Sequence, residues 1–225
     1  MDKIIPPDKQ IAAKLPLRIL IVDDHAIVRD GLKQLLHQHF QSATFGEGRN
    51  AQDALQRVAS EPWDVLLLDI TMPGQSGLDV LKQVVELQPK TKILVLTMHP
   101  EDQYAVRVLK TGAAGYLTKE TASEEVVNAV TKVLGGGRYV SAKFAESLVG
   151  KLNGKVEKAP LETLSDREYQ VLRAIAAGKS VKEIGFDLSL SVKTVSTYRA
   201  RILKKLALHT TADVIRYAMR EKLVD

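Results

Sequence analysis

Short apolar runs that end in polar residues constrain the fold of this chain more than any other feature. Runs of this length and composition are typical of buried strands in a parallel sheet whose two faces are both covered. The polar residues that close them are Asp23 and Asp24 after 17–22, Asp69 after 65–68, Thr97 after 93–96, and Thr118 and Lys119 after 114–117. Because ligands bind outside the carboxyl ends of such strands, we expect these side chains at one edge of the sheet.

The side chains expected at this edge include three carboxylates, from Asp23, Asp24 and Asp69, and the ammonium group of Lys119. Carboxylates placed close together repel each other unless a proton or a cation relieves the repulsion. Carboxylate oxygens are also ligands that suit Mg²⁺. The sequence therefore predicts a magnesium site at the carboxyl edge of the sheet.

Strand and helix patterns alternate five times in the first part of the chain. Strand patterns fall near 17–22, 42–45, 64–68, 92–97 and 114–117, and helical patterns fall near 26–39, 51–59, 77–87, 101–110 and 123–134. Such alternation predicts a parallel sheet with helices on both faces. We therefore expect an α/β domain over residues 17–137, with a doubly wound, flavodoxin-like sheet of five parallel strands.

The remaining segments differ in character from this domain. Residues 1–16 lack an apolar core segment and are expected to form a disordered leader, and residues 138–160 are expected to form a linker. From 161 to 225 the patterns are helical throughout, near 167–177, 181–188, 192–206 and 210–221. The chain should therefore carry a second, all-α domain of four helices.

The second domain contains a helix-turn-helix pattern. Ser165 begins a capping-box sequence, and Ser191 is the expected N-cap of the helix near 192–206. That helix follows a short helix and a tight connection, the arrangement in which the second helix enters the DNA major groove. Its expected buried residues are Val192, Val195, Ile202, Leu203 and Leu206. Its candidate contacts to DNA bases and phosphates are Lys193, Thr194, Ser196, Thr197, Ala200, Arg201, Lys204 and Lys205.

Charge is distributed unevenly along the chain. Residues 1–135 carry a net charge of −2, whereas residues 136–160 and 161–225 carry +3 and +4. A basic second domain favours a polyanionic partner. The chain has no cysteine, and no apolar stretch approaches the ~20 residues that a membrane span needs. We therefore expect a cytoplasmic protein without membrane association.

Both domains carry motifs of a known family. In the first domain these are Asp23-Asp24-His25, Asp69-Ile70-Thr71-Met72-Pro73-Gly74, Gly77-Leu78-Asp79, Val95-Leu96-Thr97 and the stretch from Gly112 to Lys119. In the second they are the stretch from Leu164 to Leu172, Lys182-Glu183-Ile184 and Lys193-Thr194-Val195. The first domain resembles the receiver domain of bacterial response regulators, and the second resembles the DNA-binding domain of the LuxR/FixJ/NarL group.

The resemblance implies a role for each residue at the expected edge. Asp69 matches the phosphoacceptor, and Asp24, Asp69 and the backbone carbonyl of Thr71 match the protein ligands of Mg²⁺. Asp23 matches a neighbouring acid that acts through water. Lys119 matches the lysine that pairs with the phosphate, Thr97 the hydroxyl that swings toward it, and Tyr116 the aromatic residue whose rotamer follows that hydroxyl.

The function that the resemblance implies is transcriptional regulation in a bacterial two-component system, not catalysis on an external substrate. A sensor histidine kinase would phosphorylate Asp69, the phosphorylated chain would form a homodimer, and the dimer would bind two half-sites in double-stranded promoter DNA. Ser196 departs from the pattern, because many relatives have a basic residue there. This departure puts the target sequence in doubt, though not DNA binding.

Three other interpretations stay open at this point. A phosphatase-like hydrolase would carry a second acid two residues after Asp69, where this chain has Thr71. A nucleotide-binding domain would carry a glycine-rich loop after its first strand, and residues 23–28 contain no glycine. A constitutive DNA binder that needs no phosphorylation is disfavoured by the acidic residues and Lys119, but is not excluded by them.

Overall fold

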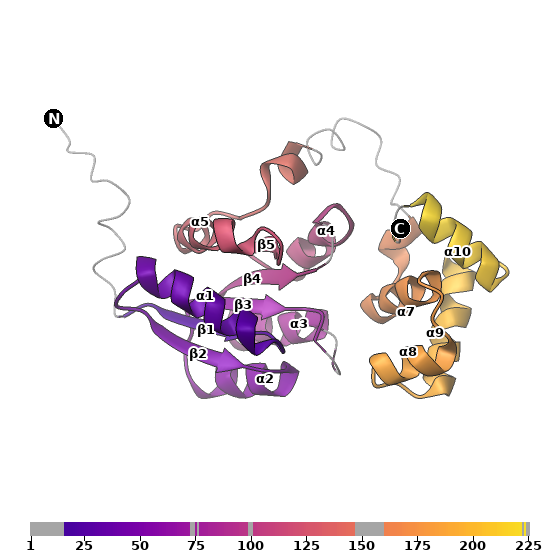
Figure 1. Cartoon of the computed structure of the whole chain (residues 1–225), viewed down its shortest axis with the longest axis horizontal. Helices are drawn as coiled ribbons and strands as arrows, with labels where there is room; N and C mark the ends of the chain where they lie inside the picture. Colours follow the sequence, from indigo (N-terminus) through magenta and orange to yellow (C-terminus); the bar gives the residue numbers. More distant parts are fainter. Residues whose placement is uncertain are drawn as a thin grey trace.

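Five parallel strands form the centre of the first domain (Figure 1). They are β1 (Arg18–Val22), β2 (Thr44–Gly48), β3 (Val65–Asp69), β4 (Lys92–Thr97) and β5 (Gly115–Thr118), in the order β2-β1-β3-β4-β5. The structure is a computed structural model that describes residues 16–72, 75, 77–98, 101–146, 160–221 and 223. The five-stranded doubly wound sheet expected from the sequence is therefore confirmed, while all but Pro16 of the predicted leader lies outside the described residues.

Helices cover both faces of this sheet. Alternate strand residues on one face, such as Ile21 and Leu67, pack with α1 (Ala26–His39) and α5 (Ala122–Leu134). Residues on the other face, such as Leu20 and Leu66, pack with α2 (Ala51–Ser60), α3 (Gly77–Leu87) and α4 (Glu101–Thr111). Because both faces are covered, all of β3 is buried, which explains why its sequence is a continuous apolar run.

The second strand lies later in the chain than its sequence pattern suggested. The expected strand stopped at residue 45, before a stretch with two glycines, yet β2 continues to Gly48. Gly46 lies directly against the Trp63 ring, since a Cβ atom there would stand 2.2 Å from Trp63 Cη2. The absence of a side chain at Gly46 thus makes room for the buried indole, and this packing outweighs the low strand preference of glycine.

Part of the predicted linker packs on the first domain. Tyr139 forms a parallel bridge with Gly115 of β5, and the Tyr116 amide donates a hydrogen bond to the Tyr139 carbonyl, 2.9 Å away. Phe144 is 4% exposed, and the Ser141 amide donates to Glu101 Oε1. Residues 138–146 therefore extend the first domain, and residues 147–159 lie outside the described part of the chain.

The second domain begins with a short 3-10 turn, η3 (Pro160–Thr163), and continues as α7 (Asp166–Ala176), α8 (Val181–Asp187), α9 (Val192–Lys205) and α10 (Thr211–Arg220). Ser165 and Glu168 form the expected capping box, and the Ser191 side chain accepts a hydrogen bond from the Thr194 amide as the expected N-cap. Val195 and Ile202 are fully buried, but Val192 is 50% exposed. The expectation for Val192 was wrong because this residue follows the N-cap directly, where no preceding helical turn covers it.

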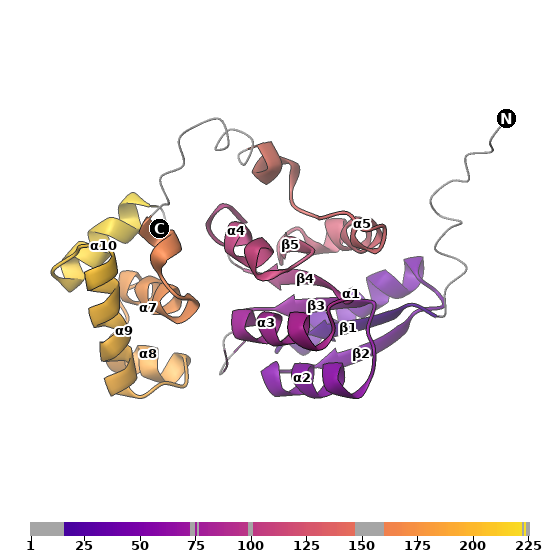
Figure 2. The same ribbon diagram turned by 180° about the vertical axis from the view of Figure 1, so that it is seen from behind.

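The two domains are in contact through α4 and α7. The rings of Tyr104 and Tyr169 meet edge to face, with 5.2 Å between their centroids. Figure 2 shows the same arrangement from behind, with α7 on the side of the second domain that faces the first and α9 farther away. Among the described helices, none has both the length and the apolar run that a membrane crossing requires.

Candidate functional site

The carboxyl ends of four neighbouring strands bring the expected polar residues together. Asp23 follows β1, Asp69 ends β3, Thr97 ends β4, and Lys119 follows β5. Because β1, β3, β4 and β5 are adjacent and parallel, their ends lie at the same edge of the sheet. The positions follow directly from strand length and order, and no long loop is needed to gather them.

Lys119 connects two buried carboxylates at this edge. Its Nζ donates a hydrogen bond of 2.7 Å to Asp69 Oδ2 and lies 2.7 Å from Asp23 Oδ2. The other oxygen of Asp69 accepts hydrogen bonds from the amide and the hydroxyl of Thr71, two residues further on. Asp69 is 1% exposed, so its carboxyl group is held from both sides in a nearly dry environment.

Burial and charge act in opposite directions at this site. Burial raises the pKa of Asp69 above its usual value, although hydrogen bonds from Lys119 and Thr71 oppose the shift. Burial alone would lower the pKa of Lys119, but hydrogen bonds to Asp23 and Asp69 and the charges of both outweigh it, so that pKa is raised. Lys119 therefore stays charged, and its ammonium group partly offsets the cost of burying the carboxylates.

The residues present fit a divalent cation. Asp23, Asp24, His25 and Asp69 each place one ligand atom within 4.8 Å of the others. Three carboxylates outnumber the single positive charge of Lys119, so a doubly charged ion would balance the cluster, and carboxylate oxygens suit Mg²⁺. The sequence assigned no ligand role to His25, whose Nδ1 lies 2.8 Å from Asp24 Oδ1. Its position directly after the acidic pair was the available signal.

A buried arginine behind the acidic pair was also missed from the sequence. Arg29 on α1 donates a hydrogen bond of 2.8 Å from Nη1 to the carbonyl of Asp23, and its Nε lies 3.3 Å from Glu47 Oε2. Lys33 binds the other oxygen of Glu47. Arg29 thus fixes the backbone at the end of β1, from which Asp23 and Asp24 project.

Thr97 and Tyr116 occupy adjacent strands next to this cluster. Thr97 is fully buried and Tyr116 is 1% exposed. Burial, with smaller contributions from Tyr104 and Glu101, raises the pKa of Tyr116 far above its usual value, so the phenol is neutral. The carbonyl of Thr97 accepts a hydrogen bond of 2.9 Å from the Lys119 amide. The two residues expected to act as a switch therefore lie in one buried layer with the backbone of Lys119.

The expected DNA contacts form the exposed side of α9. Lys193, Ser196, Ala200 and Arg201 are exposed, as are Thr197 and Lys204. The Ser196 and Thr197 hydroxyls donate to backbone carbonyls four residues earlier, which leaves their oxygens able to accept hydrogen bonds. Lys193, Thr194, Thr197 and Arg201 also line a hollow of about 340 Å³ together with Tyr198, which the sequence did not single out.

Lys205 differs from the other expected DNA contacts. Its Nζ lies 2.6 Å from Glu168 Oε2 and donates a second hydrogen bond to the carbonyl of Thr163. The acceptor Glu168 is 2% exposed and belongs to the capping box of α7. In the structure, Lys205 is exposed but its ammonium group joins the end of α9 to the start of α7.

Comparisons with known proteins identify the family of each domain. Residues 19–131 match the response regulator receiver domain family, and residues 162–218 match the bacterial regulatory proteins of the luxR family. The chain is 37% identical over 216 residues to the oxygen regulatory protein NreC of Staphylococcus carnosus, covering 93% of this chain and all of the relative. It is 35% identical to the response regulator UvrY of Escherichia coli, covering 92% and 95% of the two chains.

The chain belongs to the response regulators that combine a receiver domain with a LuxR-family DNA-binding domain. Solved structures of a related protein share the arrangement of elements. RcsB from Salmonella enterica serovar Typhimurium, bound to promoter DNA in the presence of a beryllofluoride phosphomimetic, is 26% identical with a TM-score of 0.64. That comparison covers 90% of this chain and 98% of RcsB.

Proposed function

We propose that the protein is a phosphorylation-dependent transcriptional regulator in the cytoplasm, with Asp69 as its phosphoacceptor. The observation that carries this proposal is the Asp69 carboxyl group, buried between Lys119 and Thr71 and surrounded by the acidic residues Asp23 and Asp24. An acid whose pKa is shifted by burial and by a specific charged partner is a candidate functional residue.

The reaction is phosphoryl transfer from a sensor histidine kinase. A carboxylate oxygen of Asp69 forms a bond to phosphorus while the bond between phosphorus and the histidine nitrogen of the kinase breaks, and the imidazole takes up a proton. Lys119, already 2.7 Å from Asp69 Oδ2, is placed to pair with the transferred phosphoryl oxygens. Asp24, Asp69 and the Thr71 carbonyl would hold Mg²⁺, with Asp23 acting through water; the bound ion neutralises phosphoryl charge.

Phosphorylation then changes the buried layer next to the site. The Thr97 hydroxyl turns toward the phosphoryl group, and Tyr116 follows it into the space that the hydroxyl leaves. This movement alters the surface of the receiver formed by α4, β5 and α5, through which two copies pair. In the homodimer, two α9 helices contact two half-sites of double-stranded DNA. The contacts come from the half-buried Thr194 and from the exposed residues Lys193, Ser196, Thr197, Ala200, Arg201 and Lys204.

Phosphoryl labelling tests the assignment of Asp69. We expect a radiolabelled, autophosphorylated sensor kinase or a small acyl phosphate to label the wild-type protein in the presence of Mg²⁺. Asp69→Asn should abolish labelling without loss of the folded circular dichroism spectrum. Asp79→Asn, which alters an exposed acid on α3, is the matched control and should label normally. Labelling that persists in Asp69→Asn would reject the assignment.

A further inference from the structure

The three acidic residues of the site are held in different ways. Asp23 and Asp69 are buried, and the ammonium group of Lys119 lies 2.7 Å from an oxygen of each. The Asp24 side chain is 30% exposed, and its Oδ1 lies 2.8 Å from Nδ1 of His25, which is itself 63% exposed. Because exposed side chains give Asp24 little support, its direction depends on the backbone that carries it.

Arg29 binds this backbone from α1. Its Nη1 donates a hydrogen bond of 2.8 Å to the Asp23 carbonyl, which belongs to the peptide group that joins Asp23 to Asp24. The amide of Asp23 donates to the Gly48 carbonyl of β2, 3.1 Å away. Since a peptide group is planar, holding its oxygen fixes the direction in which the chain continues to Asp24.

The guanidinium group of Arg29 is itself anchored on β2. Arg29 is 9% exposed, and its Nε lies 3.3 Å from Glu47 Oε2, while Lys33 Nζ lies 2.8 Å from Glu47 Oε1. The hydrogen bond from Lys33 lowers the pKa of Glu47 and, with that from Arg29, outweighs the opposing effect of burial. Glu47 is therefore ionised, and it holds the planar guanidinium group in one orientation, because Nε and Nη1 donate in fixed directions.

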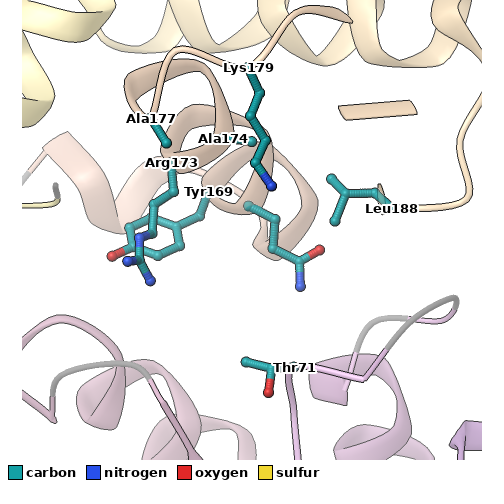
Figure 3. Close-up of a pocket in the computed structure, with 8 residues that line it drawn as sticks. Thr71, Tyr169, Arg173, Ala174, Ala177, Lys179 and Leu188 are labelled. Atoms are coloured by element: carbon teal, nitrogen blue, oxygen red, sulfur yellow. The ribbon is translucent and has the colours of Figure 1, made fainter. Parts of the chain in front are cut away.

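The two sides of the acidic pair differ in what surrounds them. β2 lies on one side of β1, and β3, which leads to Thr71, lies on the other. Thr71 lines a hollow of about 320 Å³, and Figure 3 shows Tyr169 and Arg173 of α7 projecting toward it from the opposite wall. The side that carries Thr71 therefore borders a hollow, whereas the side that carries Arg29 is packed between α1 and β2. Firm support for the acidic pair comes from the Arg29 side.

We infer that Arg29 is a positioning residue of the magnesium site, which directs the Asp24 carboxylate by binding the Asp23 carbonyl. Glu47 holds Arg29 in the orientation that this contact requires. The inference rests on the proposed function, in which Asp24 is a direct ligand of Mg²⁺. Removing partners that orient metal ligands lowers metal affinity by roughly 10- to 100-fold. Because the charge of Glu47 offsets that of Arg29, the effect of Arg29 on the ion is geometric and not repulsive.

Substitutions at Arg29 separate geometry from charge. Arg29→Gln removes both, whereas Arg29→Lys keeps the positive charge but has a single ammonium group, which cannot reproduce the two fixed directions of the guanidinium. Glu47→Gln weakens the anchor and leaves Arg29 in place. Arg49→Gln is the matched control, since this arginine follows β2, is exposed and pairs with Asp53, without contact to the acidic pair.

Mn²⁺ is the probe of the site, because it prefers the same oxygen ligands as Mg²⁺ and its free ion is counted by electron paramagnetic resonance. The full chain is titrated with Mn²⁺ without any phosphodonor. Urea unfolding without metal reports whether each variant folds. Fluorine NMR at saturating Mg²⁺ reports the affinity for beryllofluoride, a step that follows metal binding.

We expect Arg29→Gln and Arg29→Lys to weaken Mn²⁺ binding by roughly 10-fold or more, and Glu47→Gln to weaken it less. Arg49→Gln should stay within about 2-fold of wild type, because its ion pair is exposed. At saturating Mg²⁺, Arg29→Lys should bind beryllofluoride as wild type does, since the bound ion already holds Asp24 in place.

Full Mn²⁺ affinity of Arg29→Lys would overturn the inference, because charge alone would then be sufficient. An equal loss of Mn²⁺ and beryllofluoride affinity would also overturn it, since a general loss of structure acts on both. If Arg29→Gln does not fold, Arg29→Lys and Glu47→Gln decide the result. Wild type that fails to bind Mn²⁺ would refute the proposed magnesium site itself, whereas normal binding by wild type and all variants would refute only the role of Arg29.

Discussion

The phosphorylation site and the DNA-contacting side of α9 are built in opposite ways. Asp23, Asp69 and Thr97 are almost fully buried, and each has its position fixed by the end of a strand. Lys193 and Arg201 are exposed on one helix, and neither forms an ion pair with another residue in the described part of the chain. A buried charge must be paired or neutralised, whereas water solvates an exposed charge, which therefore needs no partner within the protein before it binds a ligand.

This difference predicts different consequences of mutation. Removing a charge from the buried site should cost folding free energy and alter Mg²⁺ binding together, because the same contacts serve both. Removing a charge from α9 should weaken DNA binding while the free energy of unfolding stays unchanged.

Lys119→Ala should have the largest effect. It leaves Asp23 and Asp69 buried without the ammonium group between them, and breaking a buried pair in this way costs about 3 kcal/mol. We expect urea unfolding without Mg²⁺ to show this loss. Added Mg²⁺ should stabilise the variant more than wild type, since the ion then balances the same carboxylates. A loss below about 1 kcal/mol that Mg²⁺ does not alter would contradict the claim that Lys119 neutralises buried carboxylates.

Lys193→Ala and Arg201→Ala should each weaken binding to duplex DNA by about 1 kcal/mol and reduce the slope of log affinity against log salt by about 1. Their unfolding free energies should stay within about 0.5 kcal/mol of wild type. Lys205→Ala is the informative counterpart from the same helix. Since its ammonium group binds Glu168 and Thr163, it should lower stability and leave the salt slope nearly unchanged. Equal salt slopes for all three variants would contradict the assignment of Lys193 and Arg201 to DNA binding and of Lys205 to a structural contact.

Glu168→Gln should have the smallest effect, and it should depend on pH. Burial alone would raise the pKa of Glu168, but hydrogen bonds from Lys205 and Ser165 outweigh it and lower that pKa. A carboxyl group with a lowered pKa contributes stability above its unfolded-state pKa and loses it as pH falls through the folded value. We expect a loss of about 1 kcal/mol at pH 7. The gap between variant and wild type should close in acid, and a gap that widened there would contradict the assignment.

The sequence predicted the receiver well because its signals are local. A buried parallel strand needs a continuous apolar run, and the runs at 92–97 and 65–68 mark β4 and β3 to within one residue. The strand that was placed too early, β2, owes its position to Trp63 packing over Gly46, a contact between distant residues. Capping residues such as Ser165 and Ser191 were equally readable, since a cap acts within one helical turn.

The same distinction between local signals and contacts of distant residues applies to the residues of the functional sites. Asp23, Asp24, Asp69, Thr97 and Lys119 could be placed at one edge because strand ends determine their positions. Arg29 and the pairing of Lys205 with Glu168 could not, because each depends on how a helix packs against another element. The contact of Tyr104 with Tyr169 could not be predicted from the sequence either. Residues in different domains, joined by a polar stretch, give no local signal of their contact.

Light scattering on the purified protein tests the central claim most directly. The protein is measured with Mg²⁺ alone and with Mg²⁺ plus beryllofluoride, a mimic of an aspartyl phosphate, and the Asp69→Asn variant is measured in parallel. We expect wild type to change from monomer to dimer only with beryllofluoride, and Asp69→Asn to stay monomeric in both conditions. A constant mass of wild type, together with unaltered affinity for DNA, would contradict the phosphorylation switch and identify a constitutive DNA binder.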